Sequence, residues 1–271
     1  MSNNIKGFSK YLVIFIDILG SQNRNDYQET YKINDIFHEE LQNNTSYDME
    51  HTVYFRKVYS FSDCAYIFYG FKDGIEDTRK DLGKLFTVAL CNCEPIFLRF
   101  IKERILFRGG ISYGEAYIDL NRSMFFGPAV NKAYKLESET AIHPRIIIDS
   151  VVAEETINNI EQVKYRTLAN DTAYLPYLLA YIVPPMPFTG DGIVKKDIDG
   201  QYIYNYLHFP ENNIILSQYY SSAEDFINEL IEFCKKQIEN IQSYKIQDKY
   251  FYLKRFSEKI LSNLLSDANL V

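Results

Sequence analysis

An apolar, β-branched segment near the N-terminus limits what this chain can fold into. Residues 10–19, KYLVIFIDIL, contain a run from Tyr11 to Leu19 that only Asp17 interrupts. The run is too short to span a bilayer, which takes about 20 apolar residues. It therefore predicts a strand that is covered on both faces by the rest of the domain. The same run places a lone carboxylate close to the end of a buried strand.

The composition permits such a core. Of 271 residues, 46% are hydrophobic and 24% charged, which suits one large domain or one domain with an appendage. A net charge of −7 argues against a general nucleic-acid binder, although a metal ion could still bring a nucleotide to an acidic protein. The N-terminal segment has no apolar signal core, and the cysteines form no CxxC pair. We expect a cytoplasmic protein with no membrane and no nucleic-acid partner.

Periodicity along the chain predicts an α+β fold, a mixed sheet with flanking helices. Strands are expected at 10–19, 53–59, 64–71 and 145–149, a strand pair at 104–119 with bends at Gly109, Gly110 and Gly114, and helices at 27–43, 76–103 and 129–140. Pro95 could kink or split the second helix. Turns are expected at Pro184-Pro185 and Asp199-Gly200, and helices at 222–242 and 246–266. We expect a core over 1–150 and an extension over 151–271 packed on it, not clearly a separate domain.

Asp17 and Asp63 are the candidate ligands of a cation. Asp63 lies in a tight turn, Ser60–Asp63, between the strands expected at 53–59 and 64–71. A hairpin tip beside the first strand would bring the two carboxylates together, and a hard divalent cation would relieve their repulsion. The alternative is that Asp63 caps its turn while Asp17 faces solvent. The residues alone leave both interpretations open.

Four segments together resemble a known family. FIDILG at 15–20, FSDCAYIFY at 61–69, RGGISYGEAY at 108–117 and FFGPAVNKAYKLE at 125–137 occur in that order. This resembles the class III nucleotidyl cyclase domain over roughly residues 10–150. The resemblance implies a ferredoxin-like core and a catalytic role for residues 1–150. It also implies that Asp17 and Asp63 hold two divalent cations, Mn²⁺ or Mg²⁺, with the backbone carbonyl of Ile18 as a further ligand.

The resemblance also suggests roles on one helix. Asn131 matches an asparagine that orients the ribose, and Lys135 stands where the family has a transition-state arginine. Residues four apart share a helix face, and lysine keeps the charge but loses the bidentate fork. An ordinary solvated helix face is the alternative for this pair.

The base-contacting positions differ from both purine signatures. Tyr59 and Met124 stand where adenylyl and guanylyl cyclases carry their base-contacting residues. A bulky tyrosine could narrow the pocket and offer one hydroxyl to a smaller base. Arg108 is a further substrate-binding candidate, able to reach phosphate or base, with a surface strand charge as the alternative.

The motifs are most similar to the pyrimidine cyclases of the Pycsar anti-phage system. That similarity implies conversion of UTP to 3′,5′-cyclic UMP and pyrophosphate, with CTP as the alternative substrate. It further implies a homodimer with shared active sites and an effector that the cyclic nucleotide activates. A catalytically degenerate nucleotide-binding protein and a purine cyclase with an altered pocket are the competing hypotheses.

Overall fold

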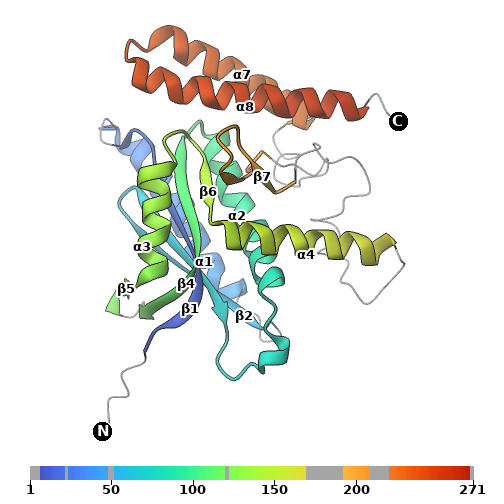
Figure 1. Ribbon diagram of the computed structural model, residues 1–271. Coiled ribbons are helices and arrows are strands. Elements are labelled where there is room, and N and C mark those ends of the chain that lie inside the picture. Colours follow the sequence, from blue (N-terminus) through green and yellow to red (C-terminus); the bar gives the residue numbers. More distant parts are fainter. Residues whose placement is uncertain are drawn as a thin grey trace. The chain divides into compact units, whose positions relative to one another are not determined.

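The computed structural model describes residues 7–21, 24–47, 52–119, 122–168, 192–207 and 220–268 (Figure 1). The chain divides into two compact units. Unit 1 comprises Met1–Ala89 and Ile105–Thr156, and unit 2 comprises Leu90–Arg104 and Ile157–Val271. The expected division into 1–150 and 151–271 stays a prediction. No helix in the described ranges is long and apolar enough to cross a bilayer.

Unit 1 is built on a mixed sheet. Its strands are β1 (Ser9–Ile18), β2 (Tyr54–Phe61), β3 (Cys64–Phe71), β4 (Phe107–Asp119), β5 (Met124–Phe126) and β6 (Ile146–Ile148). Their order in the sheet is β2-β3-β1-β4-β6, and β5 pairs with β4. The β4–β6 pairing is parallel and the other pairings are antiparallel. The predicted mixed sheet with flanking helices and a helical C-terminal part is therefore confirmed.

The helices α1 (Tyr27–Tyr47) and α3 (Pro128–Lys135) contact this sheet. Unit 1 also contains a 3₁₀ turn at Asp77–Arg79 and a π-helical segment at Leu136–Thr140. The helices α2 (Leu82–Lys102) and α4 (Ser150–Leu168) each continue from unit 1 into unit 2. In Figure 1, α3 runs along the strands β1 and β4. Pro128 occupies the first turn of α3, where its missing N–H costs no hydrogen bond.

The alternation of side chains along β1 sorts the core into two layers. Val13 and Phe15 belong to a cluster that also holds Ala129 and Ala133 of α3. Leu12, Ile14 and Ile16 are fully buried as well, and successive strand residues point to opposite faces. The strand is therefore covered on both sides, as its unbroken apolar run predicts.

The segment 104–119 differs from expectation. It is one long strand, β4, rather than a strand pair, and its hairpin partner is β5. The glycines serve close packing instead of bends: a Cβ on Gly110 would collide with the carbonyl oxygen of Ala133 on α3. Pro95 lies inside α2 without splitting it. The helix expected over 129–140 is present, with its last turn widened to a π-helix.

Unit 2 is mainly helical. Its described elements outside α2 and α4 are the hairpin strands β7 (Val194–Lys196) and β8 (Tyr202–Tyr204), and the helices α7 (Ala223–Asn240) and α8 (Tyr244–Ala268). The predicted turn at Asp199-Gly200 is confirmed between β7 and β8, where Gly200 has a φ of +81°. The turn predicted at Pro184-Pro185 lies outside the described residues. The two predicted C-terminal helices are present as α7 and α8.

Candidate functional site

The carboxylates of Asp17 and Asp63 come from adjacent structural elements. Asp17 is the penultimate residue of β1, and Asp63 lies in the two-residue turn between β2 and β3. Such short hairpin loops need a positive φ at their first central residue, and Ser62 has a φ of +54°. The backbone amide of Ile18 donates a 2.9 Å hydrogen bond to the carbonyl oxygen of Asp63. The turn is thereby fixed to the end of β1.

The electrostatics of this pair favour a cation. Burial raises the pKa of Asp17, the guanidinium of Arg108 opposes that rise, and the charge of Asp63 adds to it. Within the described ranges, no cluster of three or more His, Cys, Asp or Glu side chains is arranged to hold a metal. Two carboxylates nevertheless fit a hard cation whose remaining ligands are phosphate, water or backbone oxygens.

Arg108 is directed at carboxylates. It lies opposite Asp17 in the β1–β4 ladder, and its Nε and one terminal nitrogen each donate a 3.4 Å hydrogen bond to Asp17 Oδ2. Its Nε also lies 2.5 Å from Glu137 Oε1. This contact is an ion pair, since Glu137 Oε1 accepts no hydrogen bond of good geometry. The predicted role of Arg108 in substrate binding stays a prediction.

Glu137 is a third carboxylate of the site, and its sequence context does not mark it as a site residue. Its side chain is 2% exposed, whereas those of Asp17 and Arg108 are 25% and 27% exposed. Burial raises the pKa of Glu137 to about 7, with Arg108 opposing the rise and Asp17 reinforcing it. The signal in the sequence that could have pointed to Glu137 is its place in an amphipathic segment, two residues after Lys135. Only the π-helical segment reveals that it faces inward.

Asn131 and Lys135 lie one turn apart on α3. Both side chains are exposed, and the backbone amide of Asn131 bonds the carbonyl oxygen of Gly127 at 3.0 Å. Neither forms an ion pair or side-chain hydrogen bond with Asp17 or Asp63 in the described part of this chain. The two residues are thus available to a ligand or to a partner surface, and their catalytic roles stay predictions.

Tyr59 lies on β2 and Met124 on β5, two strands that do not pair with each other. Tyr59 on β2 packs edge-on against Phe125 of β5, with ring centroids 4.9 Å apart, and Met124 is the residue before Phe125. Tyr66 joins the same cluster, 4.8 Å from Phe125. All of these side chains are partly exposed. The structure therefore places Tyr59 in an aromatic cluster with Phe125 and Tyr66, and the role of Met124 stays a prediction.

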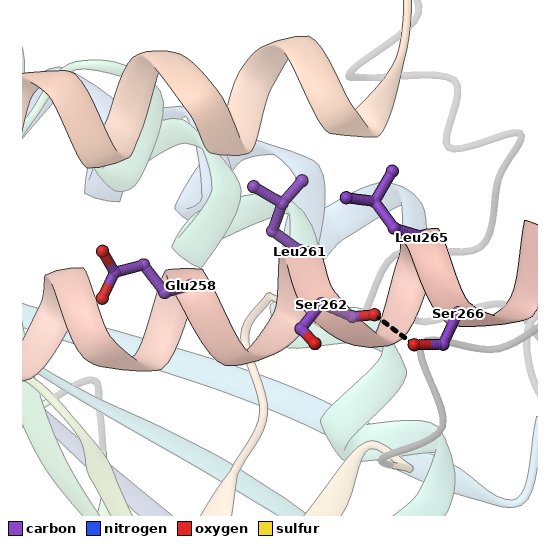
Figure 2. A pocket seen from close by; sticks show the side chains of 5 residues that line it. All are labelled: Glu258, Leu261, Ser262, Leu265 and Ser266. Carbon is purple, nitrogen blue, oxygen red and sulfur yellow. Dashed lines mark hydrogen bonds between the residues drawn. The ribbon is translucent and has the colours of Figure 1, made fainter.

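A pocket of about 360 Å³ lies elsewhere, on α8 in unit 2. Its lining residues are Glu258, Leu261, Ser262, Leu265 and Ser266 (Figure 2). Ser266 donates a 2.8 Å hydrogen bond to the backbone carbonyl of Ser262, one turn earlier on the same helix. Its lining contains one carboxylate, that of Glu258, and no basic group that could meet a phosphate. The chemistry of the candidate site lies with the carboxylates of unit 1.

No family model and no curated protein matches this chain. Among solved structures, the catalytic core of a rhodopsin-guanylyl cyclase with converted specificity, in complex with ATPαS, is similar at 18% identity. That similarity covers 55% of this chain and 82% of the other, with a TM-score of 0.40. A likeness this distant assigns no function by itself.

Proposed function

We propose that this protein is a pyrimidine nucleotide cyclase that converts UTP to 3′,5′-cyclic UMP and pyrophosphate. The observation that carries the proposal is the convergence of Asp17 and Asp63, tied by the 2.9 Å hydrogen bond from Ile18 to Asp63. The four ordered segments that resemble class III nucleotidyl cyclases lead in the same direction. In that family two aspartates at these positions serve a triphosphate.

The reaction needs one bond made and one broken. The ribose 3′-oxygen attacks the α-phosphorus and loses its proton, while the bond from that phosphorus to the bridging oxygen breaks and pyrophosphate departs. Such a phosphoryl transfer depends on positioning and on neutralising charge more than on covalent chemistry. Divalent cations, when bound, supply charge neutralisation and a more acidic 3′-hydroxyl. Asp17 and Asp63, with the carbonyl of Ile18, are the residues that would hold them.

The exposed polar pair on α3 supplies the remaining groups. Asn131 would form a hydrogen bond with a ribose hydroxyl and so hold the ribose in position for in-line attack. Lys135, one turn later on the same face, would place its ammonium on the charge that develops on the phosphate. Lys135 offers a point charge and not a bidentate fork. It can therefore stabilise the negative charge on the phosphate but fixes the orientation of the phosphate less tightly than an arginine would.

The base would lie against the aromatic cluster around Tyr59. The ring of Tyr59 is held by Phe125, and its hydroxyl can pair with one edge of a uracil. Tyr59 and Met124 would narrow the space for the base, which disfavours a purine. We favour UTP over CTP by analogy with the pyrimidine cyclases of anti-phage defence, where the cyclic product would activate an effector.

We further propose a homodimer with two shared sites. Asp17 and Asp63 of one protomer would work with Asn131 and Lys135 of the other, which fits a two-fold interface. The exposure of both α3 side chains in the single chain is consistent with that division.

Product analysis tests the function. The purified protein is incubated with Mn²⁺ and each of the four nucleoside triphosphates in separate reactions, and the products are separated by mass. The expected result is cyclic UMP with equimolar pyrophosphate from UTP. Cyclic CMP alone would transfer the assignment to CTP, and cyclic AMP or cyclic GMP alone would overturn pyrimidine specificity.

A second candidate function has a specific observation in its favour. The guanidinium of Arg108 already bonds Asp17, and Lys135 replaces the expected arginine. Both features would suit a degenerate cyclase fold that binds a nucleotide without turnover. Nucleotide binding with no cyclic product from any triphosphate would favour this alternative.

A further inference from the structure

Arg108 is shared unequally between two carboxylates. Its Nε lies 2.5 Å from Glu137 Oε1, against 3.4 Å from Asp17 Oδ2. Both hydrogen bonds to Asp17 end on the same oxygen, Oδ2, so the other oxygen, Oδ1, receives neither. A guanidinium that faced Asp17 alone could engage both oxygens in a bidentate pair. The geometry therefore limits the hydrogen bonds of Arg108 to one oxygen of Asp17.

We propose that Glu137 is a positioning residue that holds Arg108 back from Asp17 and so keeps Asp17 open to a divalent cation. The inference rests on the proposed function in one respect, that Asp17 binds such a cation. Glu137 itself need not touch the cation or the nucleotide. Glu137 also lies within hydrogen-bonding reach of Asp17, but its proposed effect on the cation runs through Arg108, which would otherwise compete for the same carboxylate.

The backbone around Glu137 is suited to this task because it is packed firmly. Glu137 is the second residue of the π-helical segment Leu136–Thr140, an irregularity that is frequent at functional sites. Its backbone nitrogen lies 3.0 Å from where a Cβ on Gly110 would stand, so the segment sits directly on β4. The carboxylate is 2% exposed and cannot swing into solvent. Arg108 must therefore come to Glu137.

The alternation of β4 and β1 explains why the three side chains meet. Gly110 lies beneath α3, and Arg108, two residues earlier, points to the same face of the sheet. Asp17 is two residues after Phe15, whose ring packs on Tyr134 of α3. Asp17 and Arg108 therefore project toward the end of α3, where the chain continues into Glu137. A purely structural ion pair between Arg108 and Glu137 would need no third partner.

Direct measurement of Mn²⁺ binding tests the proposal without relying on turnover. Mn²⁺ affinity is measured by electron paramagnetic resonance of the free ion, with full-length protein and no nucleotide. The variants are Glu137→Gln, Arg108→Gln and the double variant, and Glu139→Gln, an exposed glutamate of the same segment, is the matched control. Thermal unfolding is followed in parallel, so that loss of fold is separated from loss of affinity.

We expect the Arg108→Gln change to suppress the loss of Mn²⁺ affinity that Glu137→Gln causes. Glu137→Gln releases Arg108 onto Asp17 and weakens Mn²⁺ binding about tenfold, within the range for residues behind a metal ligand. Arg108→Gln binds Mn²⁺ at least as tightly as the unaltered protein, and the double variant returns to within about twofold of it. Glu139→Gln leaves the affinity unchanged. Because Arg108→Gln keeps Glu137 in place, its affinity decides the question even where Glu137→Gln fails to fold.

Two results would overturn the inference. Unchanged affinity in a folded Glu137→Gln, or weaker binding in Arg108→Gln, means that Glu137 does not protect Asp17 from its neighbour. Failure of the proposed function has a different signature: the unaltered protein binds no Mn²⁺, or binding survives Asp17→Asn. If Mn²⁺ affinity depends on Asp17 but does not change in Glu137→Gln, the present inference is wrong and the proposed function still stands.

Discussion

Asp17 and Arg108 lie directly opposite each other on the antiparallel strands β1 and β4, with hydrogen bonds of 3.4 Å between their side chains. A carboxylate and a cation at paired positions of a ladder reduce each other's cost of burial. The pair lies at the end of β1 that is tied to Asp63. The charge balance of the site therefore depends on two neighbouring strands and one turn, and each can be tested separately.

Removing either aspartate charge should abolish turnover while leaving the fold intact. Asp17→Asn and Asp63→Asn are each expected to lower the rate of cyclic UMP formation at least about 100-fold, since each removes a group that holds charge at the phosphate. Rates are measured by product mass spectrometry and folding by circular dichroism. The control is Asp77→Asn, whose side chain is 95% exposed in an ion pair with Lys80. Full activity in either site variant contradicts the cation-binding role.

Two inactive variants should restore activity when combined, if the sites are shared. Asp17→Asn and Asn131→Ala are each expected to be inactive as homodimers. A mixed dimer places both changes in one site and leaves the other intact, so statistical mixing should recover about a quarter of full activity. The two proteins are mixed after mild dissociation and assayed with UTP. Absence of any recovery, despite mixed dimers seen by native mass spectrometry, would show that each protomer works alone.

Tyr59 should govern the choice of base. Tyr59→Ala opens the space beside Phe125 and is expected to shift the ratio of UTP to ATP turnover toward ATP by about tenfold. Tyr59→Phe keeps the ring and tests the hydroxyl alone. The ratio of kcat/KM values for the two substrates is the measurement. A uniform loss for all nucleotides would show that Tyr59 supports the fold of the pocket and not its selectivity.

Stability in the absence of divalent cations should fall as pH rises. The pKa of Glu137 is raised from an ordinary 4.5 to about 7, so the folded protein holds this proton more tightly than the unfolded chain. Its stabilising contribution is complete below about pH 4.5 and is lost as pH rises to about 7. Urea unfolding in EDTA across this window should show the decline, which Glu137→Gln should flatten. A rise in stability with pH that depends on Glu137 contradicts this sign.

Gly110 should not tolerate a side chain. A Cβ there would collide with the carbonyl oxygen of Ala133 and approach Leu136 to 2.8 Å. Gly110→Ala is therefore expected to lower the free energy of unfolding by about 1–3 kcal/mol, the usual cost of overpacking. Gly114→Ala is the matched control on the same strand, since its Cβ would meet Ala129 at an ordinary 3.7 Å. Equal stabilities in chemical denaturation would refute the packing argument.

The sequence predicts the part of the site that depends on short-range geometry. An apolar strand ending near Asp17 and a tight turn at Asp63 predict that the two residues are neighbours. The structure pairs β1 with β3 and bonds the amide of Ile18 to the carbonyl oxygen of Asp63, while the role of the two carboxylates stays a prediction. The turn is shorter than predicted, since β2 extends to Phe61. Short loops of this kind leave few alternatives, which is why the convergence could be inferred.

The remaining features depend on tertiary packing and could not be inferred. Glycines in 104–119 suggest bends, because sequence alone cannot distinguish a bend from a helix lying close to a strand. Glu137 has no signature until the π-helical segment turns it inward. The chain also passes from one compact unit to the other within the single helix α2. The helical spacing of apolar residues in α2 continues across that boundary, so the sequence gives no sign of it.

The position of Tyr59 has an evolutionary consequence. It lies on β2, the outermost strand at one side of the sheet in unit 1, whereas Asp17 lies on β1, which is paired on both sides. Mutations on an outer strand disturb fewer neighbours than mutations on an inner one. If the proposed function holds, lineages that share this scaffold are expected to exchange one preferred nucleobase for another repeatedly, while the two aspartates proposed to bind cations hardly change.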